Sequence, residues 1–421
     1  MSFTDAQKEN KIELALSIST RLAQEFGGSG RTPGSVVLWP AFESPEQARR
    51  EVQRIAFYVG EHEPSLRYSV EDAISFDCPG VRVPETDLIG LTRLPESLVL
   101  VWKYESLRAL PLRALRRIRI VDPNFHDKCE ALTAARLVRW DLASPDKNAR
   151  LEELSRRRLR NYHVDMSGPA AVFGTGPGLD LFSPDEISNF GTRVGCNSMV
   201  VSEDVLRRTK PNVICFGDPV FHFGHSEQAA EFRDALQTYV ERENPWVFLP
   251  FEFGGWVDDL ILENDRVIPL GKTRRGRFNI PNDHSPIRRV TGNVLTELML
   301  PVAAAVSSDL HIFGCDGRPP SSDRFWDYGK GVHDEDRYST AVDAHPSFFR
   351  DRRYVRYYEE HCETLESLLV QLESNDVQIT NRSPSQVPAL KRRSKLDLSS
   401  PARTSSTIDL SATEESEETA Q

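Results

Sequence analysis

Small residues follow one of the strands expected in the second half of the chain. The segment GTGPG (174–178) comes after the apolar run 170–173 and before an expected helix. Backbone N–H groups of its glycines, such as Gly174 and Gly176, can therefore approach a phosphate or a ribose without a Cβ in the way. The segment is neither GxGxxG nor a P-loop ending in GK[ST], so a tight structural turn and a nucleotide site are equal interpretations of it.

Polar side chains stand at the ends of three further expected strands. Asn197 lies in VGCNS, Asp218 in CFGDP and Asp316 in GCDG. Ligands of open α/β sheets bind outside the carboxyl ends of the strands, so we expect Thr175, Asn197 and Asp218 to converge on one crevice. The alternative is that Asn197 and Asp218 cap the turns or helices that follow them. Binding and turn formation are equally open roles for Asp316.

Two short patterns have the composition of a metal site. The segment HDED (333–336) contains two spaced carboxylates of the kind that hold Mg²⁺ or Mn²⁺ on a diphosphate, but no apolar strand precedes it. His222 and His225 lack an evident third ligand, so we expect them to line the pocket beside Asp218 or to pack. The six cysteines include no CxxC pair, which argues against a zinc knuckle or a disulfide framework. We therefore expect neither a metal site nor a cofactor.

Composition excludes several classes of protein. The chain has 421 residues, with 52 Lys and Arg against 63 Asp and Glu and a formal net charge of -11. A globally basic face that coats nucleic acid is therefore not expected. No apolar run approaches the roughly 20 residues that span a bilayer, and the N-terminus lacks the pattern of a signal peptide. We expect a cytoplasmic protein without a transmembrane segment; peripheral binding at the inner face of the membrane and self-association stay open.

The elements that position these residues fall into two α/β units. Residues 1–140 alternate expected helices with strands near 36–39, 98–102 and 118–122. This alternation predicts a parallel sheet, hence a small N-terminal α/β domain of unknown role. Residues 169–393 alternate again, which predicts a doubly wound, Rossmann-like, mostly parallel sheet.

A linker and a tail complete the chain. Residues 141–168 carry a charged helix whose arginines we expect on a solvated face: Arg156, Arg157, Arg158 and Arg160. In residues 394–421 few apolar residues remain, and Ser, Thr, Glu and Pro predominate, so we expect an acidic, disordered tail.

The ordered series FGTGPGL, VGCNS, ICFGDP, RRVTGN and LHIFGCDG, followed by a late histidine, resembles the bacterial lipooligosaccharide sialyltransferases of glycosyltransferase family 42. It is also similar to motility-protein glycosylation enzymes and to hydroxymethylpterin diphosphokinase-like proteins. The resemblance covers residues 170–390 and leaves the first 140 unmatched. It implies the sialyltransferase-like variant of the GT-A type of Rossmann fold, a CMP-activated nonulosonic acid donor, and inverting transfer to a sugar hydroxyl without a metal.

The resemblance also implies roles for individual residues. The nucleotide and donor pocket would be lined by three residues at the strand ends, Thr175, Asn197 and Asp218. The donor's carboxylate or ribose would contact a turn formed by Thr291, Gly292 and Asn293. Two departures leave the donor open, because the family's Asn in the glycine-rich turn is Thr175 here and its Ser is Gly178.

His345 matches the position of the family's catalytic base. An unperturbed imidazole pKa near 6.5 suits a general base at neutral pH, and a structural histidine is the alternative. Tyr328 and Tyr338 resemble the paired tyrosines that donate to the leaving phosphate, although packing is the simpler role for either tyrosine taken alone. Arg288 and Arg289 are further candidate charges for that phosphate.

We therefore expect a glycosyltransferase that moves a sialic-acid-like nonulosonate from a CMP-activated donor to a cell-surface glycan acceptor. The second hypothesis is an ATP-dependent diphosphokinase that acts on a pterin-like alcohol, with Asp218 and Asp316 on Mg²⁺. The third is a non-catalytic nucleotide-binding scaffold.

Overall fold

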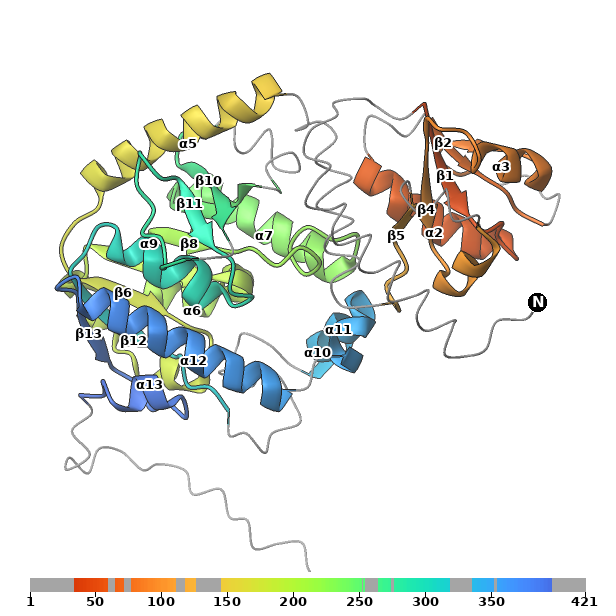
Figure 1. Ribbon diagram of the computed structural model, residues 1–421. Coiled ribbons are helices and arrows are strands. Elements are labelled where there is room, and N and C mark those ends of the chain that lie inside the picture. Colours follow the sequence, from red (N-terminus) through yellow and green to blue (C-terminus); the bar gives the residue numbers. More distant parts are fainter. Residues whose placement is uncertain are drawn as a thin grey trace, which may run out of the picture.

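The protein contains two parallel sheets, each with helices on both faces (Figure 1). The structure, a computed structural model, describes residues 34–59, 65–71, 77–110, 118–125, 145–251, 253, 264–273, 276–318, 335–351 and 354–395. The expected α/β architecture with parallel strands is confirmed. The tail expected to be disordered lies outside the described residues, apart from its first two.

The smaller sheet has the strand order β3-β2-β1-β4-β5, and all its neighbouring strands run parallel. Helix α2 covers one face of this sheet, and α3 and η2 cover the other. Strands β1 and β4 are buried along their whole length, which explains their continuous apolar sequences. The elements are β1 (Ser35–Trp39), α2 (Pro45–Val59), β2 (Leu66–Tyr68), β3 (Val81–Arg82), α3 (Glu85–Leu91), β4 (Ser97–Val101), η2 (Tyr104–Ala109) and β5 (Ile118–Ile120).

The larger sheet has eight parallel strands in the order β11-β10-β9-β8-β7-β6-β12-β13. From β6 the chain proceeds outward on one side as far as β11 and then returns to the other side of β6 with β12. The boundary between β6 and β12 is therefore the topological switch point of this sheet. The strands are β6 (Ala170–Phe173), β7 (Thr192–Cys196), β8 (Val213–Cys215), β9 (Trp246–Pro250), β10 (Val267–Thr273), β11 (Ile287–Arg289), β12 (Asp309–Phe313) and β13 (Gln378–Asn381).

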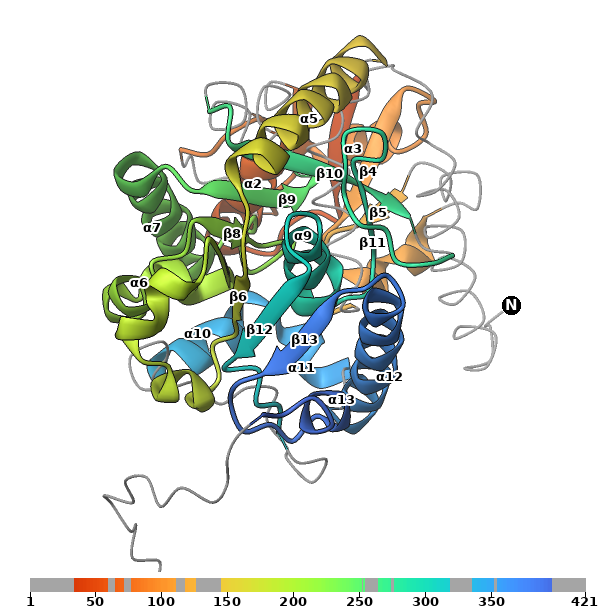
Figure 2. The ribbon, with the colours of Figure 1, turned by 90° about the vertical axis from the view of Figure 1, so that its left-hand side faces the viewer.

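Helices lie on both faces of the larger sheet, as Figure 2 shows from the side of β12 and β13, and they pack on it through two apolar layers. One layer is formed by α5 (Pro145–Asp165), the π-helical η8 (Leu295–Met299), α9 (Leu300–Ala304) and α12 (Tyr354–Glu373). The opposite layer is formed by η4 (Pro177–Leu181), η5 (Pro184–Asn189), η6 (Asn197–Val201), α6 (Glu203–Thr209) and α7 (Glu227–Glu243). Shorter helices complete the domain: α10 (Glu335–Ala344), α11 (Pro346–Asp351) and α13 (Pro388–Lys391).

The arginine-rich helix α5 packs on the larger sheet. Leu159 and Tyr162 are fully buried in the same core as β10, and Arg158 is 0% exposed, with its Nη1 donating to the Val267 carbonyl at 2.9 Å. The prediction of a solvated arginine face is correct for Arg157, whose side chain is 52% exposed, and wrong for Arg158. The long aliphatic stem of Arg158 crosses the core face of the helix, and the first residue of β10 accepts one of its guanidinium N–H groups, while its buried Nε has no hydrogen-bond partner among the described residues.

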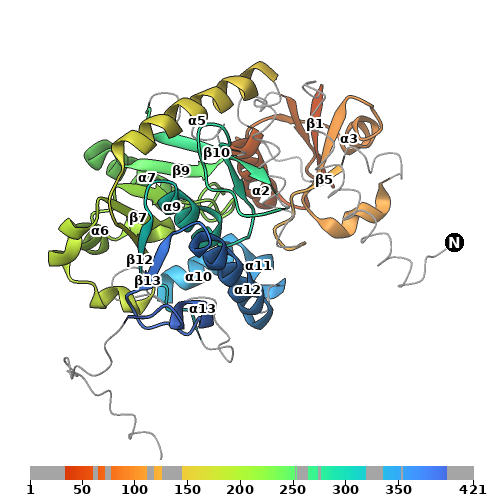
Figure 3. The same cartoon turned by 60° about the vertical axis from the view of Figure 1, so that its left-hand side comes forward.

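The two sheets meet through loops and short helices. Figures 1 and 3 show α10 and α11 beside the smaller sheet, and the end of α2 contacts the loop before α7 and the first half of that helix. Helix α2 and the residues after β5 make the hydrogen bonds of this contact, to His225 and Arg350 respectively. No helix within the described ranges is both long enough and apolar enough to cross a bilayer.

Candidate functional site

The glycine-rich turn 174–178 lies at the switch point of the larger sheet, against the loop 314–317 that follows β12. The Gly174 N–H donates to the Phe313 carbonyl and the Gly176 N–H to the Gly314 carbonyl, both at 2.8 Å. These bonds extend the pairing of β6 with β12 beyond the strand ends. The two segments that were expected to form one edge are therefore in direct contact.

The carboxylate of Asp316 lies inside this turn. It accepts a hydrogen bond from the Gly178 N–H at 2.8 Å, and a Cβ placed on Gly176 or Gly178 would lie 2.1 Å from one of its oxygens. Burial raises the pKa of this carboxyl, while the Gly178 N–H opposes the rise. The turn-forming role of Asp316 is thus observed, and its close approach is one physical reason for glycine at 176 and 178.

Asn197 follows β7, the strand next to β6. Its backbone is left-handed, with φ of 47°, a conformation that costs free energy for a residue with a Cβ. Its Oδ1 is buried and has no hydrogen-bond partner among the described residues. The expected capping role is not seen. A strained residue with an unsatisfied buried acceptor at a strand end is typical of a ligand-binding position.

Asp218 follows β8 and caps its own turn. Its Oδ1 accepts from the N–H groups of Val220 and Phe221, both at 2.9 Å, and its own N–H donates to Nδ1 of His222 at 3.0 Å. Burial lowers the pKa of His222 to about 4, so the imidazole is neutral. The capping interpretation of Asp218 is confirmed. His222 packs beside Asp218, and packing was one of the two roles expected for this histidine.

His225 does not pair with His222. It faces the smaller domain, where its backbone N–H donates to the Tyr58 hydroxyl at 3.2 Å. Groups of three His, Cys, Asp or Glu side chains with the geometry of a metal site do not occur in the described part of the chain.

The turn 291–293 is held by Glu297 from the next helical turn. One carboxylate oxygen accepts from the N–H groups of Thr291 and Gly292 at 3.0 and 3.2 Å, and the other accepts from Arg288 Nε at 2.7 Å. Arg288 is 2% exposed and also donates to the Leu270 carbonyl. Its expected role as a charge for the leaving phosphate is therefore wrong. The buried guanidinium, bonded to Glu297 and to two strand carbonyls, holds Glu297 in position.

Arg289 is also engaged within the fold. Its guanidinium lies 4.3 Å from the ring centre of Phe278, and its Nη1 donates to the Gly276 carbonyl at 2.9 Å. The cation–π contact and the hydrogen bond fix this side chain beside β11.

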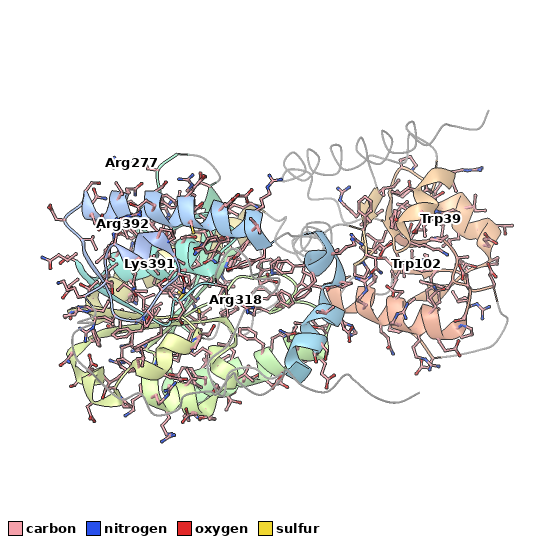
Figure 4. The ribbon with its side chains drawn as sticks, turned by 90° about the horizontal axis from the view of Figure 1, so that it is seen from below. Trp39, Trp102, Arg277, Arg318, Lys391 and Arg392 are labelled. Atoms are coloured by element: carbon pink, nitrogen blue, oxygen red, sulfur yellow. The ribbon has the colours of Figure 1, made fainter. Side chains whose placement is uncertain are left out.

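Helix α12 brings tyrosines to the same edge of the larger sheet. The Tyr357 hydroxyl accepts from Asn293 Nδ2 at 2.8 Å, while Asn293 Oδ1 caps the Leu295 N–H at 2.9 Å. One turn earlier, the Tyr354 hydroxyl bonds both backbone polar atoms of Arg318. Figure 4 shows Arg318 on the side of the larger domain that faces α10 and α11.

The sequence interpretation missed Arg318, Tyr354 and Tyr357. A signal was present for Arg318, because a cation directly after GCDG at a switch point is well placed for an anion. The tyrosines gave a weaker signal, since YVRYY reads as the apolar face of a long helix until its partner residues are known.

His345 lies at the junction of α10 and α11 and is 3% exposed. Its ring packs against Phe221 and Phe348, with ring centres 5.8 and 5.6 Å away. Phe221 belongs to the loop that Asp218 caps, so His345 and Asp218 form one corner of the site. Neighbouring strands lie about 4.8 Å apart, so this corner beyond β8 is on the order of 10 Å from the glycine-rich turn beyond β6.

The two expected phosphate-binding tyrosines remain predictions. Tyr328 lies outside the described residues. Tyr338 belongs to α10, but its side chain also lies outside them.

The switch point of the smaller sheet, between β1 and β4, is filled by aromatic side chains. The rings of Phe42 and Trp102 stack with centres 4.7 Å apart, and Trp102 Nε1 donates to the Pro40 carbonyl at 2.7 Å. Trp39 ends β1 at the same edge (Figure 4). We therefore place the candidate site on the larger sheet.

Comparison with protein-family models, with curated proteins and with solved structures gives no match for this chain.

Proposed function

We propose that the larger domain binds a nucleotide-activated sugar at the edge formed by β6, β7 and β12 and transfers the sugar to a glycan hydroxyl. A CMP-activated, sialic-acid-like nonulosonate is the donor that we favour, because the motif series resembles the sialyltransferases of glycosyltransferase family 42. The reaction would be inverting and would need no metal.

The observation that carries this proposal is the state of Asn197. Its left-handed backbone and its unsatisfied buried Oδ1 both cost stability. A ligand N–H or O–H, such as the amino group of cytosine or a ribose hydroxyl, would satisfy this acceptor. Asn293, in the turn before η8, and Arg318, directly after the switch-point loop, would supply polar and positive groups for the rest of a nucleotide.

Within this proposal, Asp218, Asp316 and Glu297 hold the loops of the site, because their carboxylates accept backbone N–H groups. Their role is to fix the strand-end turns in place before the ligand binds. His345 is the proposed base for the acceptor hydroxyl, and it must become accessible before it can act, since its ring is covered.

Thermal-shift titration with CMP, UDP, GDP and ATP, with and without Mg²⁺, tests the nucleotide class, because a ligand that binds only the folded state raises the melting temperature. Stabilisation by CMP without metal is the expected result. Release of CMP from a CMP-nonulosonate, and its increase on addition of a glycan acceptor, would then test transfer. Stabilisation only by ATP with Mg²⁺ would favour the diphosphokinase alternative, and nucleotide binding without turnover would favour the non-catalytic nucleotide-binding scaffold. No response to any nucleotide would reject the proposed nucleotide site.

Asn197→Gly is the sharpest variant for this test. Glycine adopts the left-handed conformation at no steric cost, so stability should be kept or raised while CMP affinity falls at least roughly ten-fold. Asn244 is a matched control, because it is also left-handed, with φ of 46°, and caps the end of α7 away from the site. Asn244→Gly should leave CMP affinity unchanged. Equal CMP affinity in both variants would reject Asn197 as a ligand contact.

A further inference from the structure

The smaller domain contacts the larger one at the loop that follows β8. Tyr58, near the end of α2, accepts the His225 N–H at 3.2 Å through its hydroxyl. The neighbouring Phe57 ring packs on the His225 imidazole with centres 5.3 Å apart. The Arg233 guanidinium from α7 lies 5.1 Å from the centre of the same Phe57 ring. A hydrogen bond and a ring contact therefore hold this end of the loop, and a cation–π contact holds the helix that follows it.

A second contact joins the smaller domain to α11. Arg350 donates from Nη1 to the Asn124 carbonyl at 2.5 Å and from Nη2 to the Phe125 carbonyl at 3.1 Å. Both carbonyls belong to the segment after β5. The guanidinium thus fixes α11 to the carboxyl-end loop of the smaller sheet.

The two contacts hold the loop after β8 and helix α11, and each of these elements packs a phenylalanine ring on His345. Phe221 lies four residues before His225 in the loop after β8, and Phe348 lies two residues before Arg350 in α11. The rings of Phe221 and Phe348 both pack on the His345 imidazole. His345 directly precedes α11, and its carbonyl accepts the Phe348 N–H at 3.1 Å. Separation of the smaller domain would therefore free α11, with His345 and Phe348 together, to move away from Phe221, whereas docking restrains both sides of this contact.

We propose that the smaller domain is a docking element that keeps His345 covered, and that its release from His225 and Arg350 is the movement that exposes this histidine. The docking itself stands on the contacts above. Only the functional consequence rests on the proposed function: exposure of His345 would let an acceptor hydroxyl reach its base.

Histidine footprinting of the full chain with diethyl pyrocarbonate at pH 7, read by mass spectrometry, measures this exposure without any donor sugar. Two histidines serve as internal references: His222 is 4% exposed and inside the larger domain, and the side chain of His284 is 94% exposed. In the unaltered protein His345 should react as slowly as His222. In the double variant Tyr58→Phe with Arg350→Gln, the reaction of His345 should accelerate roughly ten-fold or more while His222 stays protected, because opening no longer breaks three hydrogen bonds.

The chain offers a matched control with the same two substitutions away from the contact. Tyr358→Phe with Arg356→Gln removes a hydroxyl bond to the Gln386 carbonyl and an exposed ion pair with Glu360, both around α12. This variant should leave His345 protected. If the docking variant fails to fold, Arg350→Gln alone carries the same expectation, because its side chain is at the surface.

Three results would overturn the proposal. His345 could react as fast as His284 in the unaltered protein, or it could stay as protected as His222 in the docking variant. His345 and His222 could also become reactive together, which would show general loosening of the larger domain. Because none of these readouts involves a nucleotide, failure of the docking proposal is distinguishable from failure of the proposed transferase.

Discussion

The hydroxyl of Tyr354 accepts a hydrogen bond from the backbone N–H of Arg318 and donates one to the backbone carbonyl of the same residue, both at 3.1 Å. One side chain from α12 therefore fixes the backbone at the point where the chain leaves the switch-point loop 314–317. The direction in which the Arg318 side chain leaves the loop depends on this tyrosine.

Tyr354→Phe should remove both bonds and retain the packing of the ring. We expect the free energy of unfolding to fall by about 1–3 kcal/mol and CMP affinity to fall with it, because Arg318 loses its fixed position. Urea unfolding and calorimetric titration with CMP measure the two effects. Tyr358→Phe, which loses one bond to the Gln386 carbonyl, is the control and should change stability without changing affinity.

Gly178→Ala should be strongly destabilising, because the added Cβ would lie 2.1 Å from Asp316 Oδ1. A loss of about 2–4 kcal/mol in the free energy of unfolding is expected. Replacing Asp316 by Gly in the same chain should recover part of that loss, since it removes the atom that the methyl group meets. Gly90→Ala is the control: it has no atom within 4 Å of its Cβ position and lies in α3, so it should be neutral or stabilising by up to about 1 kcal/mol. Additive effects of Gly178→Ala and Asp316→Gly would contradict this account.

The burial of His222 predicts a pH dependence of stability. Burial lowers its pKa from 6.5 to about 4, so below pH 6.5 the unfolded chain takes up a proton that the folded chain does not. The stability that His222 contributes is therefore complete above pH 6.5 and is lost as the pH falls toward 4, by on the order of 3 kcal/mol. His361, whose pKa burial also lowers to about 4, should add a loss of the same sign.

His222→Asn isolates the first of these two histidines. The Asn oxygen can accept the Asp218 N–H in place of Nδ1, and Asn does not titrate. Urea unfolding should be measured between pH 7 and pH 4. As the pH falls, the free energy of unfolding of the variant should rise relative to that of the unaltered protein, because the two proteins share every other titrating group. A constant difference in unfolding free energy across this range would mean that His222 is not neutral in the fold.

Glu297→Gln should disrupt the turn 291–293. The carboxylate accepts three donors, from Arg288, Thr291 and Gly292, whereas a Gln side chain offers one oxygen and presents an NH₂ group to the remaining donors. A loss of about 3–5 kcal/mol is expected because Arg288 is left buried without its counter-charge. Glu203→Gln, in an exposed pair with Arg242, should cost less than about 1 kcal/mol. Losses of similar size in the two variants, read by chemical denaturation, would show that burial does not strengthen the Glu297 pairing.

Much of the fold is contained in the sequence pattern. Apolar runs of four or five residues separated by helical segments predict buried parallel strands, and they indicated β1, β4 and β6 correctly because a strand covered on both faces must be apolar along its length. The glycine-rich turn and GCDG were expected at one edge of the sheet, because parallel strands all end on the same side. The structure places them in contact there.

The partners of the polar side chains were decided by the tertiary structure. The sequence left open whether Asp218 and Asp316 bind a ligand or backbone N–H groups, because both roles require a carboxylate at a strand end. Distant segments then determined the outcome: Asp316 reaches Gly178 across 138 positions, and Arg158 reaches Val267 across 109.

The burial of His345 is the clearest case in which distant segments, and not the local sequence, determine the surroundings of a residue. Local sequence determined that a histidine precedes α11, but its burial depends on Phe221 from the loop after β8, and the docking of that loop depends on Tyr58. Strand and turn formation follow from the periodicity and conformational preferences of neighbouring residues. Burial, pairing and access depend on which segments far apart in the chain come together, and only the tertiary structure decides that.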